Sequence, residues 1–424
     1  MELGQLAHTI SAFARTRWLQ ARLRTKADVQ RYQNKQLARL ARRACATIPF
    51  CHHLPADRLD AWPVMDKAQL LANFEKLNRA GIMAAEVRQA LAGGEDHVRG
   101  YVVGQSTGTS GNRGYFVISD ADRFTWLGTL LAKTLPDALW RRHKVALAMP
   151  GMSSLYRAGG QASRIALRFF PLADGVEAWA EALVRFAPDT VVGPPKVLRR
   201  LAEEGRLTAH HIFSGAEVLD PLDRAVIEGM TGKVVREIYM ATEGLFGVAC
   251  PFGTLHLAED VVHFAWEHPI AGSALRVPVV TDFIRRTQLM ARYRMNDLLE
   301  LSETSCRCGS PLQAVARIEG RRDDVFELRA SDGDFRLMTP DILRNAVVDA
   351  DPRIQDFRIL QTGPETMEVH LPGALNGAAD AAVTNALTKV AGRMGVIPVI
   401  VVRSGIATPY DRKLRRVTRL WKLN

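Results

Sequence analysis

The sequence predicts an α/β protein with a large N-terminal domain, whose mainly parallel sheets are flanked by helices, and a small mobile α+β C-terminal domain. The chain has 424 residues, more than the roughly 250–300 at which a single hydrophobic core stops growing. Short β-branched or apolar segments alternate with helical ones, which is typical of a parallel sheet. After "IEGRRDD" (318–324) this pattern gives way to a shorter αβ alternation. We therefore expect domains at 1–320 and 321–424, with the boundary near Arg321–Asp324.

The first expected element is a basic helical segment over residues 13–48. Within it, "RYQNKQLARLARRACATI" places Leu37, Leu40, Ala41 and Ile48 on one side of a helix, which ends at Pro49. Further helices are expected at 176–187 and 195–205, between apolar runs closed by Gly, Pro or an acidic residue. The expected strands are 144–150, 164–172, 188–195, 211–217, 234–240, 274–283 and 289–295.

The net charge of +11 is concentrated at the two ends of the chain. Residues 13–43 hold ten Lys or Arg against Asp28, and residues 403–422 hold seven against Asp411. The rest of the chain is slightly acidic, so no nucleic-acid surface is expected. Two interpretations of the basic ends stay open: solvated faces of amphipathic helices, or a docking surface for an acidic or phosphate-bearing partner.

Several classes of protein are not expected from the composition. The sequence has no run approaching 18 uncharged apolar residues and no signal-peptide pattern at its start, so we expect a soluble cytoplasmic protein with no membrane partner. The five cysteines are odd in number and unevenly spread, which argues against a disulfide framework. If the chain associates with itself, a dimer is the expected form.

The segment "STGTSG" (106–111) lies between two strand-like segments and is rich in glycine and hydroxyl side chains. Glycine permits close backbone approach, and the loop amides and hydroxyls can donate to phosphate oxygens. The segment is not a Walker A loop, which would need a Gly-Lys-[Ser/Thr] ending that leads into a helix. A polar hairpin turn and a phosphate-binding loop both remain open for this segment taken alone.

An ordered series of motifs gives this loop a context. The series is "STGTSG" (106–111), "FSGAE" (213–217), "EIYMATEG" (237–244), "ARYRMNDLLEL" (291–301), "IEGRRDD" (318–324) and "PYDRKLRRV" (409–417). It resembles the core motifs of the adenylate-forming superfamily of acyl-CoA synthetases. The resemblance is closest to the phenylacetate–CoA ligase branch and to its relatives, the deazaflavin-coenzyme adenylylating synthetases. It spans essentially the whole chain and implies a large adenylate-forming domain followed by a lid domain.

The resemblance implies a role for particular residues. The loop Ser106, Thr107, Gly108, Thr109, Ser110 and Gly111 would contact the β- and γ-phosphates of ATP. Gly215, Ala216, Glu217 and Tyr239 would surround the adenine, and Asp297 and Arg321 would hold the rest of the nucleotide. Thr242 would hydrogen-bond a phosphate and Glu243 would bind Mg²⁺, which prefers oxygen ligands. Lys413 would bridge the acid carboxylate and the α-phosphate.

The implied reaction has two steps. A carboxylate attacks the α-phosphate of Mg·ATP, pyrophosphate leaves, and the acyl-adenylate is then transferred to the thiol of coenzyme A or of the phosphopantetheine on an acyl carrier protein. The resemblance also implies a hinge near Asp323, about which the C-terminal domain would move and take Lys413 out of the site between the steps. Two alternatives stay open: AMP transfer to a hydroxyl of a deazaflavin-type acceptor, and a binding protein that has lost catalysis.

The small carboxylic acid substrate is specified less well. Its expected pocket lies between residues 150–160, "FSGAE" and "MATEGLFG", with Tyr156, Phe213 and Phe246 as aromatic walls. These side chains favour an aromatic acid. Where the superfamily has lysine after the second loop glycine, this chain has Asn112-Arg113, so the contacts to the γ-phosphate can differ.

A second group of residues has the character of metal ligands. Cys250-x5-His256 and Cys306-x-Cys308 together supply three cysteines and one histidine, a set found at structural zinc sites. From the residues alone, a metal site and free buried thiols both stay open. The resemblance implies a structural Zn²⁺ that joins the loop after Glu243 to the segment before the hinge. Cys45, Cys51, His52 and His53 are interpreted instead as a helix end.

Overall fold

The computed structural model describes residues 3–106, 114–149, 164–270, 272–375, 377–406 and 414–422. Its backbone forms two compact units. Unit 1 comprises 1–267, 278–295 and 301–316, and unit 2 comprises 268–277, 296–300 and 317–424. The expected domain boundary near residue 320 stays a prediction, because two short segments before it, 268–277 and 296–300, belong to unit 2.

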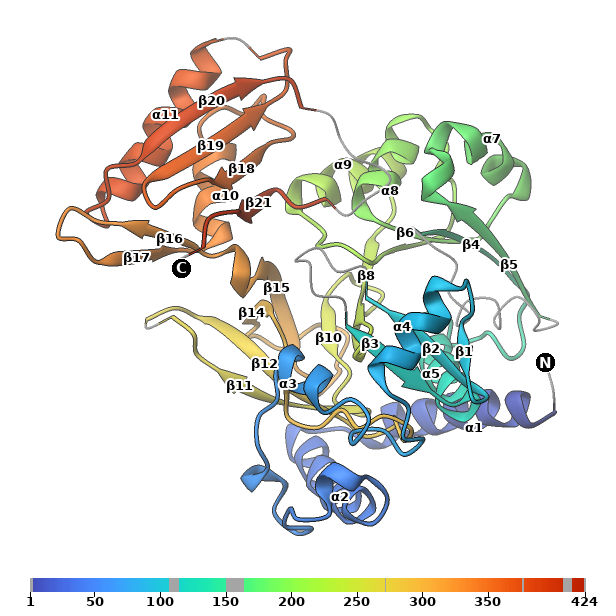
Figure 1. The fold of residues 1–424 in the computed structure, drawn as a ribbon. Helices are drawn as coiled ribbons and strands as arrows, with labels where there is room; N and C mark the ends of the chain where they lie inside the picture. Colours follow the sequence, from blue (N-terminus) through green and yellow to red (C-terminus); the bar gives the residue numbers. More distant parts are fainter. Residues whose placement is uncertain are drawn as a thin grey trace. The chain divides into compact units, whose positions relative to one another are not determined.

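The centre of unit 1 is a sheet with the strand order β5-β4-β6-β7-β8, in which every neighbouring pair is parallel. Its strands are β4 (His143–Met149), β5 (Ile165–Pro171), β6 (Thr190–Gly193), β7 (His211–Ser214) and β8 (Val235–Ala241). The antiparallel strands β9 (Gly244–Ala249) and β10 (Leu255–Leu257) extend it beyond β8. Figure 1 shows α7 (Val176–Phe186), α8 (Pro195–Glu203) and α9 (Pro221–Thr231) beside these strands.

This sheet confirms the α/β class, and most of its strands lie where apolar runs predict them. The order reverses between β4 and β6: the chain passes from β4 outward to β5, then returns to β6 on the other side of β4. In open α/β sheets, ligands bind beyond the carboxyl ends of the strands near such a point. The segments that follow β6, β7 and β8 therefore lie at the edge where a ligand is expected.

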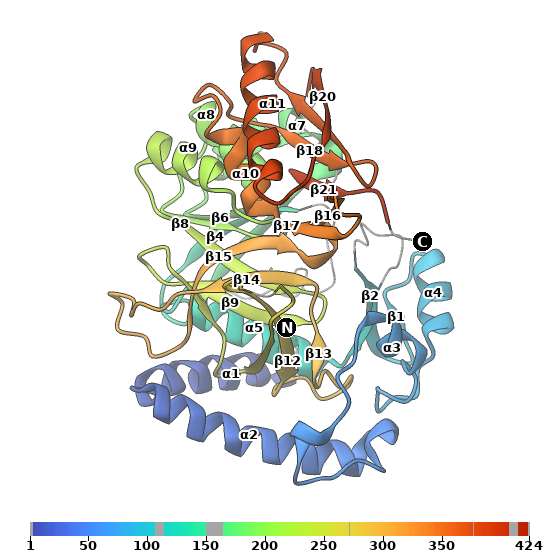
Figure 2. The same ribbon diagram turned by 90° about the vertical axis from the view of Figure 1, so that its left-hand side faces the viewer.

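The expected basic helical segment is formed by two long helices, α1 (Leu3–Arg22) and α2 (Lys26–Thr47). Both lie at the lower edge of unit 1 in Figure 2. Helix α1 packs on α5 (Asp120–Thr134) so closely that a Cβ on Gly128 would lie 2.1 Å from the carbonyl oxygen of Thr9. Phe13 joins Leu135, Val145 and other apolar residues in the core between these helices and the sheet. Thr25 caps α2 in a capping box with Asp28, which explains the break between the two helices.

The remaining elements of unit 1 surround the sheet. They are the helices α3 (Lys67–Ala72) and α4 (Ala84–Ala92), the small antiparallel sheet β1 (His97–Val98), β2 (Tyr101–Gln105) and β3 (Tyr115–Ile118), and the strands β11 (Val262–Glu267) and β13 (Tyr293–Arg294). Short 3₁₀ turns lie at Pro49–Cys51, Leu59–Ala61 and Leu172–Asp174. Strands β12 (Leu275–Asp282), β14 (Asp297–Leu301) and β15 (Ala314–Arg321) each have residues in both units. No described helix combines the length and the apolar character needed to cross a membrane.

Unit 2 is a small α+β body. Its four-stranded sheet has the order β20-β19-β18-β21, formed by β18 (Arg358–Gln361), β19 (Thr366–Leu371), β20 (Val399–Ser404) and β21 (Val417–Arg419). Helices α10 (Pro340–Val348) and α11 (Gly377–Gly392) lie beside this sheet in Figure 1. The hairpin β16 (Phe326–Arg329) and β17 (Phe335–Met338) follows the 3₁₀ turn Arg322–Asp324.

Candidate functional site

The strands β2 and β3 position the glycine-rich loop. They pair antiparallel, with Gln105 opposite Tyr115, so the loop is a hairpin connection as its flanking segments predict. Ser106 and Gly114 close the loop at its base: the Ser106 amide donates to the Gly114 carbonyl at 2.7 Å, and the Gly114 amide donates to Ser106 Oγ at 2.8 Å. Thr107, Gly108, Thr109, Ser110 and Gly111, and with them Asn112-Arg113, lie outside the described residues.

The segment 215–217 follows β7 at the carboxyl edge of the sheet. The Gly215 amide donates to the Gly193 carbonyl at 3.0 Å, which joins this segment to the end of β6. Ala216 has φ of +68°, a left-handed conformation that costs a non-glycine residue roughly 1–2 kcal/mol. Glu217 lies 3.2 Å from Lys196 Nζ, and both side chains are nearly fully buried. Strained backbone conformations such as that of Ala216 cluster at functional sites.

Thr242 and Glu243 form the two-residue turn between β8 and β9, in which Ala241 pairs with Gly244. Thr242 Oγ1 donates to Glu243 Oε2 at 2.9 Å, and the Tyr293 hydroxyl donates to Glu243 Oε1 at 3.3 Å. Tyr239, on the same strand, is buried and packs against Phe246 with ring centroids 5.3 Å apart. The Glu243 carboxylate is therefore held by two hydroxyl donors at the end of a parallel strand.

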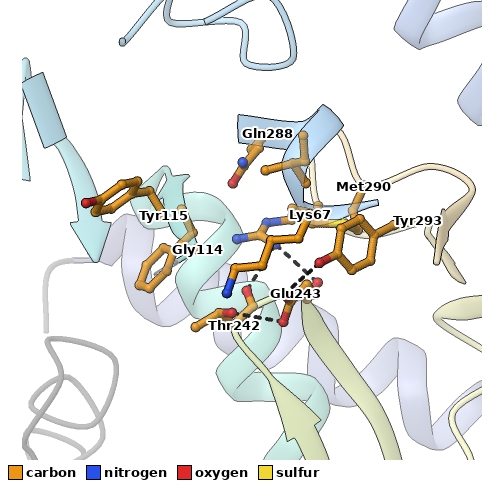
Figure 3. Close-up of a pocket in the computed structure, with 11 residues that line it drawn as sticks. Lys67, Gly114, Tyr115, Thr242, Glu243, Gln288, Met290 and Tyr293 are labelled. Atoms are coloured by element: carbon orange, nitrogen blue, oxygen red, sulfur yellow. Dashed lines mark hydrogen bonds between the residues drawn. The ribbon is translucent and has the colours of Figure 1, made fainter. Parts of the chain in front are cut away.

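A pocket lies beside this turn. Figure 3 shows the side chains of Lys67 and Tyr293 directed toward Thr242 and Glu243. A Cβ placed on Gly114 would lie 3.2 Å from Cε of Lys67, so the closed base of the glycine-rich loop adjoins this lysine. The pocket is lined by Lys67, Leu70, Gly114, Tyr115, Phe116, Thr242, Glu243, Arg285, Gln288, Met290 and Tyr293.

Lys67 was not predicted from the sequence. Its position at the start of a helix could have indicated a functional role. Asp66 caps α3, so Lys67 is the first residue of that helix. A cation is unfavourable there because the positive end of the helix dipole is close. A lysine kept at this position is readily explained if it serves an anionic ligand. Gln288 is a second missed residue: it is fully buried, and its Nε2 has no hydrogen-bond partner among the described residues.

Two acidic residues beneath the turn belong to the same network. Burial raises the pKa of Asp282 to about 6, and the backbone amide of Arg285 opposes this rise by donating to the carboxylate. Asp122 accepts from the backbone amides of Arg286 and Thr287 at 3.0 and 2.9 Å. These carboxylates fix the segment 282–287, which contains Arg285, and the pocket-lining Gln288 follows it directly.

Asp297 and Arg321 lie in unit 2, next to one another along paired backbone segments. The Arg322 amide donates to the Asn296 carbonyl at 2.7 Å, and Asn296 Nδ2 donates to Asp323 Oδ2 at 2.7 Å. The structure thus brings Asn296 and Asp297 together with the segment 320–323 ("GRRD") within unit 2. Lys413 lies outside the described residues, and the chain just after it is anchored to the same unit by an Arg415–Asp324 ion pair.

The acid pocket expected from the sequence is not supported by its two described aromatic residues. Phe213 and Phe246 are fully buried. Arg236 lies over the Phe213 ring, 4.5 Å from its centroid, and Phe264 packs against Phe246. Both phenylalanines are core residues and not pocket walls, because β7 and β9 are buried along nearly their whole length and neighbouring side chains cover both rings. Tyr156 and the segment 150–163 lie outside the described residues.

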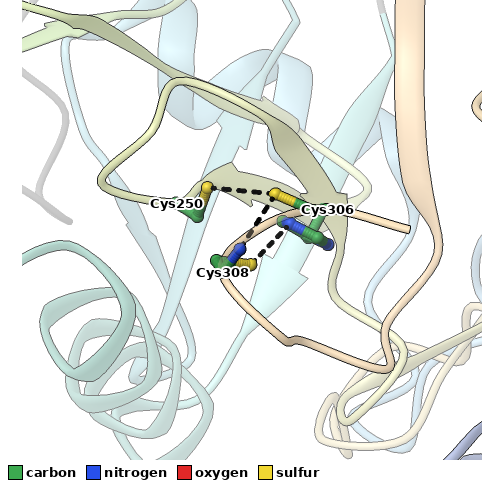
Figure 4. A group of neighbouring side chains, drawn as sticks. Cys250, Cys306 and Cys308 are labelled. Atoms are coloured by element: carbon green, nitrogen blue, oxygen red, sulfur yellow. Dashed lines mark hydrogen bonds between the residues drawn. The ribbon is translucent and has the colours of Figure 1, made fainter. Parts of the chain in front are cut away.

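The predicted metal ligands come together. The ligand atoms of Cys250, His256, Cys306 and Cys308 all lie within 4.8 Å of one another. Figure 4 shows the three cysteines gathered at one place; Sγ of Cys250 and Sγ of Cys306 are 3.8 Å apart, and Cys308 Sγ is 3.2 Å from His256 Nε2. Zn–S bonds of about 2.3 Å in a tetrahedron place two sulfurs about 3.8 Å apart. His256 Nδ1 donates to the Leu312 carbonyl at 3.0 Å, which leaves Nε2 facing the cysteines.

Comparisons with known proteins agree with the fold. No protein-family model and no curated protein sequence matches the chain. A 2-hydroxyisobutyryl-CoA ligase in the postadenylation state, in complex with 2-HIB-AMP, matches with a TM-score of 0.68 and 19% identity over 91% of this chain and 88% of its own. The GH3.15 acyl acid amido synthetase matches with a TM-score of 0.58 and 13% identity, over 89% of this chain and 87% of its own. ATP-bound MatB from Rhodopseudomonas palustris matches with a TM-score of 0.54 and 15% identity, over 74% of this chain and 66% of its own.

These similarities show that the chain shares the fold of adenylate-forming enzymes, and they confirm the fold class. At 13–19% identity they are similarities of fold alone. The phenylacetate–CoA ligase branch is one of several with this fold and stays a prediction.

Proposed function

We propose that this protein activates a carboxylic acid with ATP, forming an acyl-adenylate and pyrophosphate, and then transfers the acyl group to a thiol. The observation that carries this proposal is the Thr242–Glu243 turn at the carboxyl edge of the sheet, facing a pocket that Lys67 and the base of the glycine-rich loop complete. The solved structures with this fold include ligases bound to an acyl-adenylate and to ATP, which supports the same reaction here.

In the first step, an oxygen of the carboxylate attacks the α-phosphorus and the bond to the β-phosphate breaks. Thr242 and the loop 106–111 would donate to phosphate oxygens, and the Lys67 ammonium, at the loop base, would offset the negative charge that passes to pyrophosphate. The Glu243 carboxylate would hold Mg²⁺, which would supply positive charge to offset the charge of the phosphates. Lys413 would contact the acid carboxylate and the α-phosphate.

Other residues would contact the adenine and the ribose of the nucleotide. In unit 1, the backbone of Gly215 and Ala216 would face the adenine near Tyr239, and the buried Lys196 would hold Glu217 in place. In unit 2, the Asp297 carboxylate would accept from the ribose hydroxyls, with Arg321 beside it. In the second step a thiolate attacks the acyl carbon and AMP leaves.

The thiol acceptor is coenzyme A or an acyl carrier protein, and the surface of α2 favours the carrier. Arg31, Lys35, Arg39 and Arg42 are exposed and fall on one side of the helix, over about 16 Å. Lys35, Arg39 and Arg42 make no ion pair with a described carboxylate within 4 Å. Like charges at this spacing repel one another and destabilise a helix. An acidic partner bound to this face of α2 would offset the repulsion between these basic side chains.

We also propose that the Cys250, His256, Cys306 and Cys308 cluster binds one structural Zn²⁺. The cluster connects the segment after β9 to the loop before β15. The hydrogen bond that orients the His256 ring, with Nε2 facing the cysteines, favours a metal site over a group of unbound thiols. Metal analysis of the purified protein is expected to give one zinc per chain, falling to none in Cys306→Ser. A wild-type protein without zinc that keeps its stability would contradict this assignment.

The experiment that tests the main proposal is acid-dependent ATP–pyrophosphate exchange, with benzoic, hydroxybenzoic, phenylacetic, cinnamic and fatty acids as candidates. We expect one class of these acids to stimulate exchange, and the panel identifies that class. A product in which AMP is joined to a deazaflavin hydroxyl, identified by its mass, would instead support nucleotidyl transfer.

A further inference from the structure

The turn that carries Thr242 and Glu243 has an unusual backbone for its length. A two-residue connection between antiparallel strands normally uses a type I′ or II′ turn, which needs positive φ at one or both loop residues. Among the described non-glycine residues, positive φ occurs at Arg99, Ala187, Ala216 and Arg292, and neither Thr242 nor Glu243 is among them. The β8–β9 register also shifts between Tyr239 and Met240. The local sequence alone therefore does not favour this turn.

A buried guanidinium group supports the turn from below. Arg285 NH1 donates to the Thr242 carbonyl at 3.2 Å and to the Glu243 carbonyl at 3.1 Å. Arg285 is 8% exposed. Because one donor group bridges two consecutive carbonyls, both peptide units of the turn have a fixed orientation, and so do the Thr242 and Glu243 side chains on its other side.

Acidic neighbours hold Arg285 in turn. Asp282 Oδ1 accepts from the amides of Ile284 and Arg285 at 2.7 and 2.9 Å, which closes a tight turn beneath the guanidinium. Burial lowers the pKa of Arg285, while the charges of Asp282, Asp122 and Glu243 act to raise it. A Cβ on Gly244 would lie 3.1 Å from Asp282 Oδ2, so the start of β9 also packs on this carboxylate.

We propose that Arg285 is a positioning residue, which fixes the Thr242–Glu243 turn so that the Glu243 carboxylate is aligned to bind the Mg²⁺ of Mg·ATP. The proposal rests on the proposed function for the identity of the ligand. The contact itself, from a buried charge to two turn carbonyls, stands independently of that function.

The test compares Arg285→Gln and Arg285→Lys with Arg286→Gln. Arg286 is the neighbouring residue and carries the same charge, but it is exposed, so it is a matched control. Hydrogen bonds from charged donors correspond to roughly 10- to 100-fold effects. We expect Arg285→Gln to raise the Mg²⁺ concentration for half-maximal ATP–pyrophosphate exchange about tenfold or more. Arg285→Lys should recover part of this loss, and Arg286→Gln should match wild type.

A second measurement does not depend on activity. Amide hydrogen exchange of the peptide covering residues 240–246, without substrate, should be faster in Arg285→Gln than in wild type or Arg286→Gln. Unchanged amide exchange together with unchanged Mg²⁺ dependence would overturn the proposal. A general loss of amide protection across unit 1, with the Mg²⁺ dependence unchanged, would also overturn the proposal. That result is expected of a residue that stabilises the fold and does not position Glu243. If wild-type protein shows no ATP–pyrophosphate exchange, the proposed function fails, and the local amide exchange still decides whether Arg285 fixes the turn.

Discussion

The buried ion pair between Lys133 and Asp260 gives a stability prediction whose size follows from its environment. Lys133 Nζ, on α5, lies 2.7 and 2.8 Å from the two carboxylate oxygens of Asp260, and the two side chains are 6% and 2% exposed. Replacing Lys133 with methionine leaves a carboxylate without its cation in the interior. Breaking a buried pair in this way costs about 3–5 kcal/mol in the free energy of unfolding.

The double variant is expected to behave differently. Replacing both members of a buried pair with hydrophobic residues of similar volume is often close to neutral. Lys133→Met combined with Asp260→Leu should therefore recover most of the stability that Lys133→Met loses. The assay is urea unfolding of wild type, both single variants and the double variant, followed by fluorescence, with the coupling free energy taken from the cycle.

An exposed pair provides the control. Arg141 NH1 lies 3.5 Å from Asp137 Oδ2, and the Arg141 side chain is 75% exposed. Arg141→Met should change the unfolding midpoint little, because exposed pairs are screened by solvent. The reasoning is refuted if Lys133→Met costs no more than Arg141→Met, or if the double variant loses as much as the two single variants together.

Three further predictions concern the site and the surfaces. Lys67→Met should weaken ATP binding more than acid binding, because the lysine lies at the base of the phosphate loop; equal changes in both KM values would contradict this. Lys35→Glu, Arg39→Glu and Arg42→Glu together should abolish salt-sensitive binding of a holo acyl carrier protein while leaving ATP–pyrophosphate exchange intact; equal binding by wild type and the triple variant would exclude this surface as the docking site. Burial, with Asp341 nearby, raises the pKa of Glu319 to about 7 from an ordinary value near 4.5. The folded protein thus holds this proton more tightly, so unfolding free energy should fall as pH rises from about 4.5 to 7, and Glu319→Gln should reduce that slope.

The parallel strands were predictable because each is a short apolar run ended by glycine, proline or an acidic residue. Strand β4 lies at His143–Met149 against an expected 144–150, and β8 at Val235–Ala241 against 234–240. The expected strand at 289–295 is reduced to Tyr293–Arg294. Its earlier residues bond to loops instead: the Leu289 amide donates to the Leu77 carbonyl, and the Arg292 carbonyl accepts from Met65.

Helix α1 was missed over its first half for a physical reason. Its buried face is formed by Thr9, Ala12, Phe13, Thr16 and Leu19, so two threonines and an alanine weaken the apolar periodicity. Several apolar residues, such as Leu3 and Ile10, are exposed instead. The packing that selects this face comes from α5 and the close approach at Gly128, which sequence periodicity does not report.

The candidate site was predictable where its residues follow strands in recognisable motifs, as Thr242 and Glu243 do after β8. The roles of Lys67, Arg285 and Gln288 were not predictable. Each lies far in sequence from Thr242 and Glu243 and reaches the pocket only through tertiary packing. The two phenylalanines expected in the acid pocket fail for the complementary reason. An apolar residue in a strand beside a motif can line either the ligand pocket or the core, and the sequence does not distinguish the two; in the structure Phe213 and Phe246 are fully buried in the core.

The measurement that tests the central claim most directly is carboxylate-dependent ATP–pyrophosphate exchange in wild type and Lys413→Ala, with folded, zinc-containing protein. We predict that one class of acid stimulates exchange in wild type and that Lys413→Ala abolishes it. No exchange with any acid of the panel, while the protein is folded and binds ATP, would contradict acyl-adenylation as the function of this chain.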